Sequence, residues 1–253
     1  MKHRPIIDTV VGVDGCKAGW VTALLDCRSL IGTLSLHVDF ADVVASNKEA
    51  HVIAVDMPIG LAECTARACD VEARRALGRR GSSIFSAPDR RLLDAASYQE
   101  AQAESRRLCG RGVSKQAFYL FPKIREIDRM ITPALQRRVI EVHPELCFTM
   151  LAGKPAQFSK STREGIIERK ALLPFGWHEA KLDAKPDDIV DALAAAWVAY
   201  EYFYGRARSF PAKPEKDARG LRMEIVTCPP IVPSNEPKGV FSGVYQRPGG
   251  ACR

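Results

Sequence analysis

In "VVGVDGCKAGW", residues 10–20, an apolar run ends at Asp14 immediately before Gly15. A second run, "HVIAVDMPIG" at residues 51–60, meets a carboxylate in the same way at Asp56. Short, continuous apolar runs are typical of strands that are buried on both faces of a parallel sheet. Two such strands, each ending at an aspartate, predict a central pair of strands with carboxylates at one edge.

The segments around these strands predict the rest of a sheet. "GWVTALLD" and "GTLSLHVDF" follow the first strand after short links, which is typical of a three-stranded meander. "ADVVASNKEA" predicts a short helix before the second buried strand, "RRVIEVHPE" predicts a fifth strand, and "GLRMEIVTCPP" predicts an edge strand. This order predicts an RNase H-like α/β fold, with a mixed five-stranded sheet flanked by helices. In that fold the first strand lies centrally and beside the fourth.

Residues from about 61 to 135 have helix-forming composition, interrupted by "GRRGSSIFSAPDRR", whose Gly, Ser and Pro content predicts a loop. We expect a helical insertion between the fourth and fifth strands. It is strongly basic, because from Arg67 to Arg129 the chain has 14 Lys and Arg against 8 Asp and Glu. Such a charge favours a polyanionic partner, namely DNA or RNA, while a solvated helical surface is the alternative interpretation.

The clearest helix is "KPDDIVDALAAAWVAYEYFYG", in which Pro186 suits the first turn and Gly205 is placed to end the helix. Asp188 and Asp191 are three residues apart and therefore share one face of this helix. For Asp188, the alternative is a helix-start carboxylate that the helix dipole favours. Asp191 falls among apolar residues, where a carboxylate is harder to explain without a function.

Composition limits the class of protein. Hydrophobic residues make up 46% of the chain and charged residues 26%, as in soluble globular proteins. No apolar run approaches the ~20 residues of a membrane helix, and no secretory signal is evident, so we expect a cytoplasmic protein without a membrane partner. We expect one RNase H-like domain over residues 1–228 and a flexible Pro/Gly-rich tail over residues 229–253. The eight cysteines lack C-x-x-C spacing and are expected to be buried thiols, not zinc ligands.

In the predicted sheet, Asp14 and Asp56 end neighbouring parallel strands at one edge, where sites of open α/β sheets lie. If the long helix packs beside the first strand, Asp188 and Asp191 join them. Carboxylates held together repel one another, and a divalent cation removes that conflict. Oxygen ligands suit Mg²⁺ or Mn²⁺, and two such ions ~3.5–4 Å apart promote phosphodiester hydrolysis. The four aspartates therefore predict a two-metal site, with turn residues as the alternative for Asp14 and Asp56.

Two further candidates end the predicted fifth strand. Glu141 is a candidate for an additional metal ligand or for the group that orients the attacking water. His143 is a candidate for protonating a leaving group or contacting phosphate, and a structural histidine is the alternative.

Taken in order, "GVDGCKAGWV", "AVDMPIGL", "CDVEARRALGRRGSSIFSAPDRR", "EVHPELCFTMLAGKP" and "DDIVDALAAAWVA" resemble the domain of unknown function 429 (DUF429) family. Members of this family are described as predicted RNase H-like nucleases. The resemblance spans roughly residues 10–228 and implies metal-ligand roles for Asp14, Asp56, Asp188 and Asp191. The last of these motifs is also similar to the final helix of RuvC-like resolvases, in which two acidic residues at the same spacing bind metal. The stretches "SSIFSAPDRR" and "FSKSTREG" also resemble segments of this family, and the candidate phosphate contacts in them are Ser83, Arg90, Arg91 and Lys160. Solvated loop residues are the alternative interpretation for each.

Three functions from different classes compete. The leading hypothesis is a metal-dependent nuclease that hydrolyses phosphodiester bonds of nucleic acid. The second is a nucleic-acid-binding module that kept the fold without turnover, which predicts salt-sensitive binding and no cleavage. The third is a small-molecule phosphotransferase, which "DGCKAG" disfavours because it lacks a convincing phosphate loop. We also consider a homodimer, since resolvase-type enzymes often act as dimers.

Overall fold

A computed structural model describes residues 8–230. Its main sheet has six strands in the order β5-β4-β1-β2-β3-β6. β1 and β2 are antiparallel, as are β2 and β3, whereas β4 runs parallel to β1 and β5 runs parallel to β4. The first strand thus lies centrally and beside the fourth, as the predicted RNase H-like arrangement requires. The strands are β1 Thr9–Cys16, β2 Gly19–Asp26, β3 Ile31–His37, β4 Val52–Val55, β5 Val139–Glu141 and β6 Gly176–His178.

The expected count of five strands was one too low. β6 adds to the free edge of β3 in parallel, but it is three residues long and lacks an alternating apolar pattern, so its sequence carries no strand signal. The edge strand expected at 220–230 is also wrong in its placement. β8 (Ile225–Thr227) pairs with β7 (Arg208–Phe210) in a separate two-stranded sheet. One isolated bridge, between Val142 and Val226, connects it to the end of β5.

The long helix α7 (Pro186–Phe203) lies directly against β1. A Cβ atom placed on Gly12 of β1 would sit 2.0 Å from the backbone nitrogen of Ala196 and 2.1 Å from the carbonyl oxygen of Ala192. Glycine in the strand and alanine on the helix therefore allow the two backbones to approach closely. This contact fixes where the first turn of α7 lies relative to the end of β1.

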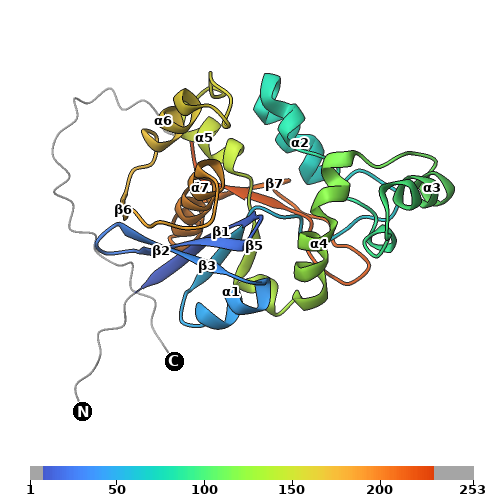
Figure 1. The fold of residues 1–253 in the computed structure, drawn as a ribbon, viewed down its shortest axis with the longest axis horizontal. Helices are drawn as coiled ribbons and strands as arrows, with labels where there is room; N and C mark the ends of the chain where they lie inside the picture. The colour runs from blue at the N-terminus through green and yellow to red at the C-terminus, as the bar shows by residue number, and fades with distance from the viewer. Residues whose placement is uncertain (1–7, 231–253) are drawn as a thin grey trace, which may run out of the picture.

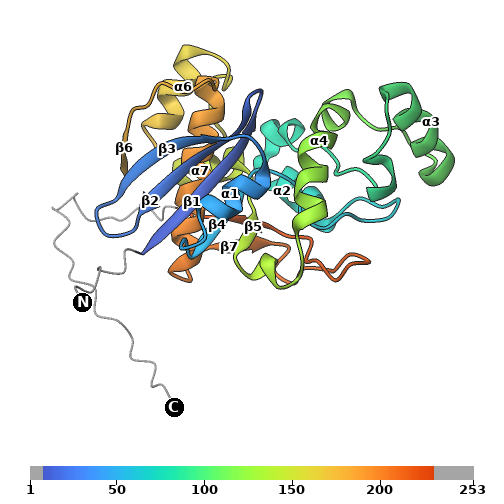
Figure 2. The ribbon, with the colours of Figure 1, turned by 60° about the horizontal axis from the view of Figure 1, so that its bottom comes forward.

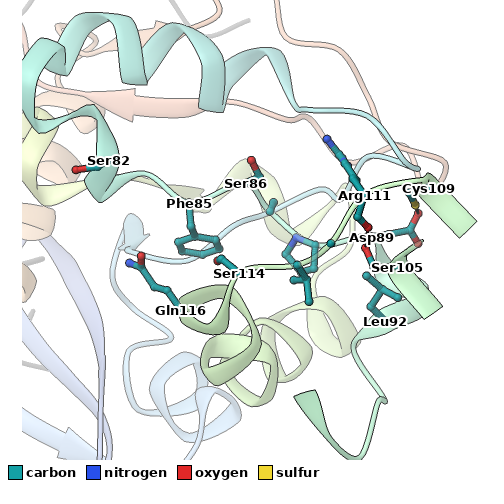
Figure 3. A pocket seen from close by; sticks show the side chains of 14 residues that line it. Ser82, Phe85, Ser86, Asp89, Leu92, Ser105, Cys109, Arg111, Ser114 and Gln116 are labelled. Carbon is teal, nitrogen blue, oxygen red and sulfur yellow. Dashed lines mark hydrogen bonds between the residues drawn. The ribbon is translucent and has the colours of Figure 1, made fainter. Parts of the chain in front are cut away.

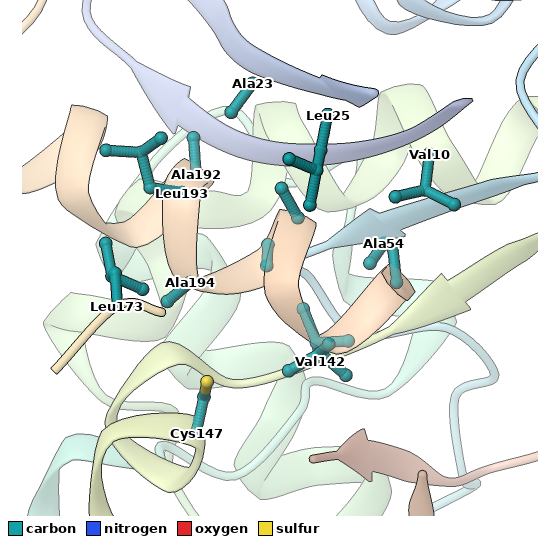
Figure 4. Packing of buried hydrophobic residues seen from close by; sticks show 14 of the residues in the cluster. Val10, Ala23, Leu25, Ala54, Val142, Cys147, Leu173, Ala192, Leu193 and Ala194 are labelled. Atoms are coloured by element: carbon teal, nitrogen blue, oxygen red, sulfur yellow. The ribbon is translucent and has the colours of Figure 1, made fainter. Parts of the chain in front are cut away.

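Alternation along the strands divides the buried side chains between two faces of the sheet. Val10 and Ala54 pack with α7, whereas Val11, Val13 and Ile53 pack on the opposite face. The α7 face is shown in Figure 4, where Ala192 and Leu193 lie on the side of the helix toward Ala23 of β2, and Ala194 lies on its other side next to Leu173. Figure 2 shows α1 (Phe40–Ser46) and α7 on opposite sides of the strands.

The predicted helical insertion between the fourth and fifth strands is confirmed by the order of the elements. It extends to one side of the sheet in Figures 1 and 2, with α3 farthest from the strands. Its helices and 3₁₀ turns are α2 Ala68–Leu77, η1 Gly78–Ser83, η2 Arg90–Leu92, α3 Tyr98–Cys109 and α4 Lys115–Met130. The remaining helices and 3₁₀ turn are η3 Leu135–Arg137, α5 Pro144–Ala152 and α6 Arg163–Lys170.

The cysteine prediction is partly wrong. Five cysteines are buried thiols, as expected; they are Cys16, Cys27, Cys69, Cys147 and Cys228. Cys252 lies outside the described residues. Cys64 and Cys109, however, form a disulfide across 45 residues of sequence. The bond joins the segment before α2 to the end of α3. Cysteine spacing carries no signal for such a pair, because the fold alone brings the two residues together.

The domain boundary predicted at residue 228 stays a prediction. The expected tail, 229–253, lies outside the described residues except for its first two positions. Within residues 8–230, no helix combines the length and apolar character that crossing a membrane demands.

Candidate metal centre

Asp14 and Asp56 lie side by side on the α7 face of the sheet. The parallel register pairs Val13 of β1 with Val55 of β4, and the Asp56 backbone N–H donates to the Val13 carbonyl at 3.0 Å. Both aspartates come one residue after a valine that packs on the opposite face, so strand alternation turns both carboxylates toward α7. The predicted meeting of two strand-end aspartates is therefore present.

The first turns of α7 bring the other two aspartates to the same place. Asp191 is buried, with 1% of its surface exposed, whereas Asp188 is half-buried and accepts a hydrogen bond from the Lys185 backbone N–H at 3.3 Å. Asp188 thus also serves as the helix-start carboxylate that the alternative interpretation offered. Asp191 has no such capping role.

All four aspartates line one cleft of about 560 Å³. His143, at the start of α5, and the predicted phosphate contacts Ser83 and Lys160 line the same cleft. Seven of the ten predicted site residues are therefore brought together from β1, the residue after β4, the end of η1, α7 and the segments that precede α5 and α6. Glu145, Arg80 and Tyr119 also line the cleft, although the sequence analysis did not select them.

Glu141 does not face this cleft. It lies on β5 between Ile140 and Val142, which pack on the α7 side, so alternation turns its carboxylate to the other side. There it receives two hydrogen bonds from the buried Arg67 guanidinium, at 2.7 and 2.8 Å, and one from the Ile59 backbone N–H at 2.7 Å. These partners occupy both carboxylate oxygens. Glu141 is therefore placed as a structural ion-pair residue and not as a metal ligand.

Arg90 and Arg91 are also placed away from the cleft. Arg90 donates to Asp128 at 3.0 Å and to Asp217, and Arg91 donates to Asp89 at 2.7 Å. Some of the arginine side chains in the insertion thus form ion pairs within the chain. The net charge of the insertion therefore overestimates how many cationic side chains are available to bind phosphate.

The Lys160 ammonium is the cation that reaches the aspartates. Its Nζ lies 2.6 Å from Asp191 Oδ2, and 46% of its side chain is exposed. Lys160 belongs to the segment between α5 and α6, which the Arg80 guanidinium holds by donating to the Phe158 carbonyl at 2.7 Å and the Gln157 carbonyl at 3.2 Å. No local sequence pattern indicates that this segment crosses over the first turns of α7.

Burial and mutual repulsion disfavour the ionised carboxylates. Burial, followed by the charges of Asp56 and Asp191, raises the pKa of Asp14 well above its ordinary value. Burial raises the pKa of Asp56 to about 6 and that of Asp191 to about 7, although Lys160 opposes both shifts. Burial also lowers the pKa of His143, which favours the neutral imidazole. Burial also raises the pKa of Asp188. Four carboxylates with raised pKa values in one cleft are typical of a functional site.

The cleft contains polar atoms that lack partners. Seven buried side-chain polar atoms have no hydrogen-bond partner in residues 8–230, and four of them belong to cleft residues. These four are Ser83 Oγ, His143 Nδ1, Glu145 Oε2 and Asp191 Oδ1. Because buried polar atoms are nearly always satisfied, this concentration indicates a site built for a polar or ionic ligand.

The donor set suits a hard divalent cation. It consists of carboxylate oxygens, the ligands that Mg²⁺ and Mn²⁺ prefer. In the described residues, however, the only three-residue cluster with ligand atoms all within 4.8 Å is Cys64, Asp89 and Cys109, whose two sulfur atoms are joined in the disulfide. The four aspartates thus line the same cleft, but no three of them have carboxylate oxygens within 4.8 Å of one another. Lys160 forms an ion pair with one of them, Asp191.

A family model described as "Protein of unknown function (DUF429)" matches residues 12–216. The match begins within β1 and ends after β7, so it includes all four aspartates, His143 and Lys160. No curated protein and no solved structure matches the chain significantly. The extent of the family match shows that the chain belongs to the DUF429 family.

Proposed function

We propose that this protein is a metal-dependent nuclease that hydrolyses a phosphodiester bond of nucleic acid. The observation that carries the proposal is the cleft that four aspartates line and in which four buried polar atoms, one of them Asp191 Oδ1, lack a hydrogen-bond partner. Asp14, Asp56 and Asp191 are the proposed ligands of Mg²⁺ or Mn²⁺, with Asp188 at the more exposed side. When bound, these ions activate a water molecule and stabilise the leaving oxygen.

The chain's own residues supply charge and proton transfer around that centre. Lys160 neutralises Asp191 before a cation binds, and because its side chain is partly exposed, its ammonium is then available to a phosphate oxygen. His143 is neutral near pH 7 because burial lowers its pKa, so its imidazole can accept a proton within the cleft. The Ser83 hydroxyl is free to donate to a phosphate oxygen.

One observation favours the second candidate, a binding module without turnover. The ion pair between Lys160 and Asp191 satisfies part of the cleft without any metal. If that pair persisted in solution in the presence of Mg²⁺, the cleft would bind nucleic acid through its rim and would cleave nothing. Nucleic acid as the partner, a homodimer and a cytoplasmic location all stay predictions.

The deciding experiment compares wild type with Asp14→Asn on single-stranded, duplex and branched DNA and RNA, each with Mg²⁺, Mn²⁺ or EDTA. Cleavage by wild type alone, and only with metal, supports the nuclease. Asp187→Asn is the matched control, because Asp187 lies in the same first turn of α7 but outside the cleft. Salt-sensitive binding without cleavage would instead support the binding module.

A further inference from the structure

A second cavity adjoins the carboxylate cleft. It has a volume of about 320 Å³ and shares Ser82, Phe85 and Gln116 with the cleft. Phe85 lies in the loop after η1, and Gln116 lies in the first turn of α4. The two cavities therefore adjoin at Phe85 and Gln116, next to the cleft that the aspartates line.

The lining of the second cavity suits a flat, partly polar ring. Figure 3 shows Phe85 and Gln116 next to each other at one end, with Asp89, Ser105 and Cys109 at the other. At that far end Asp89 is paired with Arg91, and the Ser105 hydroxyl donates to the Arg111 carbonyl at 2.7 Å. The near end offers an aromatic face and an exposed amide that carries both donors and an acceptor.

The size of the cavity restricts its occupant. Pockets that hold small ligands span roughly 300–1,000 Å³, so 320 Å³ is at the lower limit. A single unpaired nucleobase is a small flat ligand of the right chemistry, and aromatic side chains commonly stack on such bases. A base pair within a duplex is too large to enter.

We propose that this cavity is a nucleobase subsite, in which Phe85 stacks on one unpaired base and Gln116 hydrogen-bonds to its edge. The inference rests on the proposed function, because the phosphate beside that base is the one placed at the aspartates. It narrows the substrate class to single strands, or to structures with an unpaired nucleotide beside the scissile bond. The Gln116 amide can present either a donor or an acceptor, so the sequence preference is weak.

The test measures binding of two fluorescent strands of equal length, oligothymidylate and its abasic counterpart, by anisotropy with Ca²⁺ and again with EDTA. Both strands carry the same phosphates, so their affinities differ only through the bases. Wild type is expected to bind the thymidine strand about 5- to 150-fold more tightly, the range that stacking of one base gives. Phe85→Ala removes most of this ratio, and Phe85→Trp retains it.

Two further variants separate the subsite from general effects. Gln116→Ala, at an exposed position with little bearing on folding, reduces the ratio if the amide contacts the base. Tyr204→Ala is the control, because Tyr204 is an exposed aromatic residue directly after α7, at the opposite end of that helix from Asp188. It is expected to leave both affinities unchanged.

The outcomes distinguish the subsite from the nuclease. Equal binding of both strands, or a ratio that Phe85→Ala and Gln116→Ala leave intact, overturns the subsite even if metal-dependent cleavage is observed. A ratio that depends on Phe85, without cleavage of any substrate, supports the subsite and contradicts the nuclease. If neither strand binds, the subsite and the proposed substrate class both fail.

Discussion

Replacing Asp191 by asparagine is expected to stabilise the metal-free protein. The change keeps the shape of the side chain and an acceptor for Lys160 Nζ but removes a charge that is 1% exposed. Burial raises the pKa of Asp191 from 3.8 to about 7, after the favourable effect of Lys160 is included. At about 1.36 kcal/mol per pKa unit, ionised Asp191 costs the folded state about 4 kcal/mol.

The sign of the pH dependence follows from proton binding. A carboxyl group with a raised pKa binds more protons when folded than when unfolded, so its contribution to stability falls as pH rises from about 4 to about 7. Asp191→Asn lacks this contribution. The free energy of unfolding of Asp191→Asn therefore exceeds that of wild type by almost nothing near pH 4, and by at most about 4 kcal/mol above pH 7.

Urea unfolding in EDTA at several pH values measures this gain directly. Added Mg²⁺ is expected to stabilise wild type but not Asp191→Asn, because the variant has lost a ligand. Asp187→Asn is the control; its charge interacts favourably with the helix dipole and unfavourably with Asp188, so a change of only a few tenths of a kcal/mol is expected. A loss of stability in Asp191→Asn that is equal at all pH values would show that the ionised Asp191 carboxylate does not destabilise the folded protein.

Three further predictions concern the scaffold. Arg67→Met leaves Glu141 buried without its cation and is expected to cost about 3–5 kcal/mol in urea unfolding; a loss below about 1 kcal/mol would show that the pair is not needed. Gly12→Ala places a methyl group against the α7 backbone and is expected to cost at least about 3 kcal/mol, so an unchanged melting temperature would contradict the described packing. Peptide mapping without reductant is expected to recover Cys64 linked to Cys109, and reduction to lower the free energy of unfolding by about 4 kcal/mol. Recovery of both cysteines as free thiols would show that the disulfide does not form.

The sequence was sufficient to predict the features of the fold and the site that depend on local sequence patterns. Continuous apolar runs ending at Asp14 and Asp56 marked two neighbouring central strands, and the alanine-rich helix carried Asp191 to them. Each of these inferences rests on periodicity or on the end of an element. Both can be read without knowing which distant segments meet.

Sequence reasoning failed where contacts between distant segments determine which way a side chain points and what it contacts. Glu141 was selected because it ends a strand, but alternation on β5 turns it toward Arg67, a partner 74 residues away in the chain. Lys160 was identified as a phosphate contact, yet its ion pair with Asp191 depends on how the segment before α6 folds over α7. Glu145 was missed because its buried, unpartnered oxygen is a property of the cleft and not of the residues around it in sequence.

Crystals soaked in Mn²⁺ test whether the cleft aspartates bind a divalent cation. The account predicts an anomalous difference peak in the cleft, in contact with Asp14 and Asp191, and a Lys160 side chain that has left Asp191. Crystals of Asp191→Asn soaked in the same way should lack the peak or show it greatly weakened. A wild-type map with no peak in the cleft and with the ion pair between Lys160 and Asp191 intact would contradict the account.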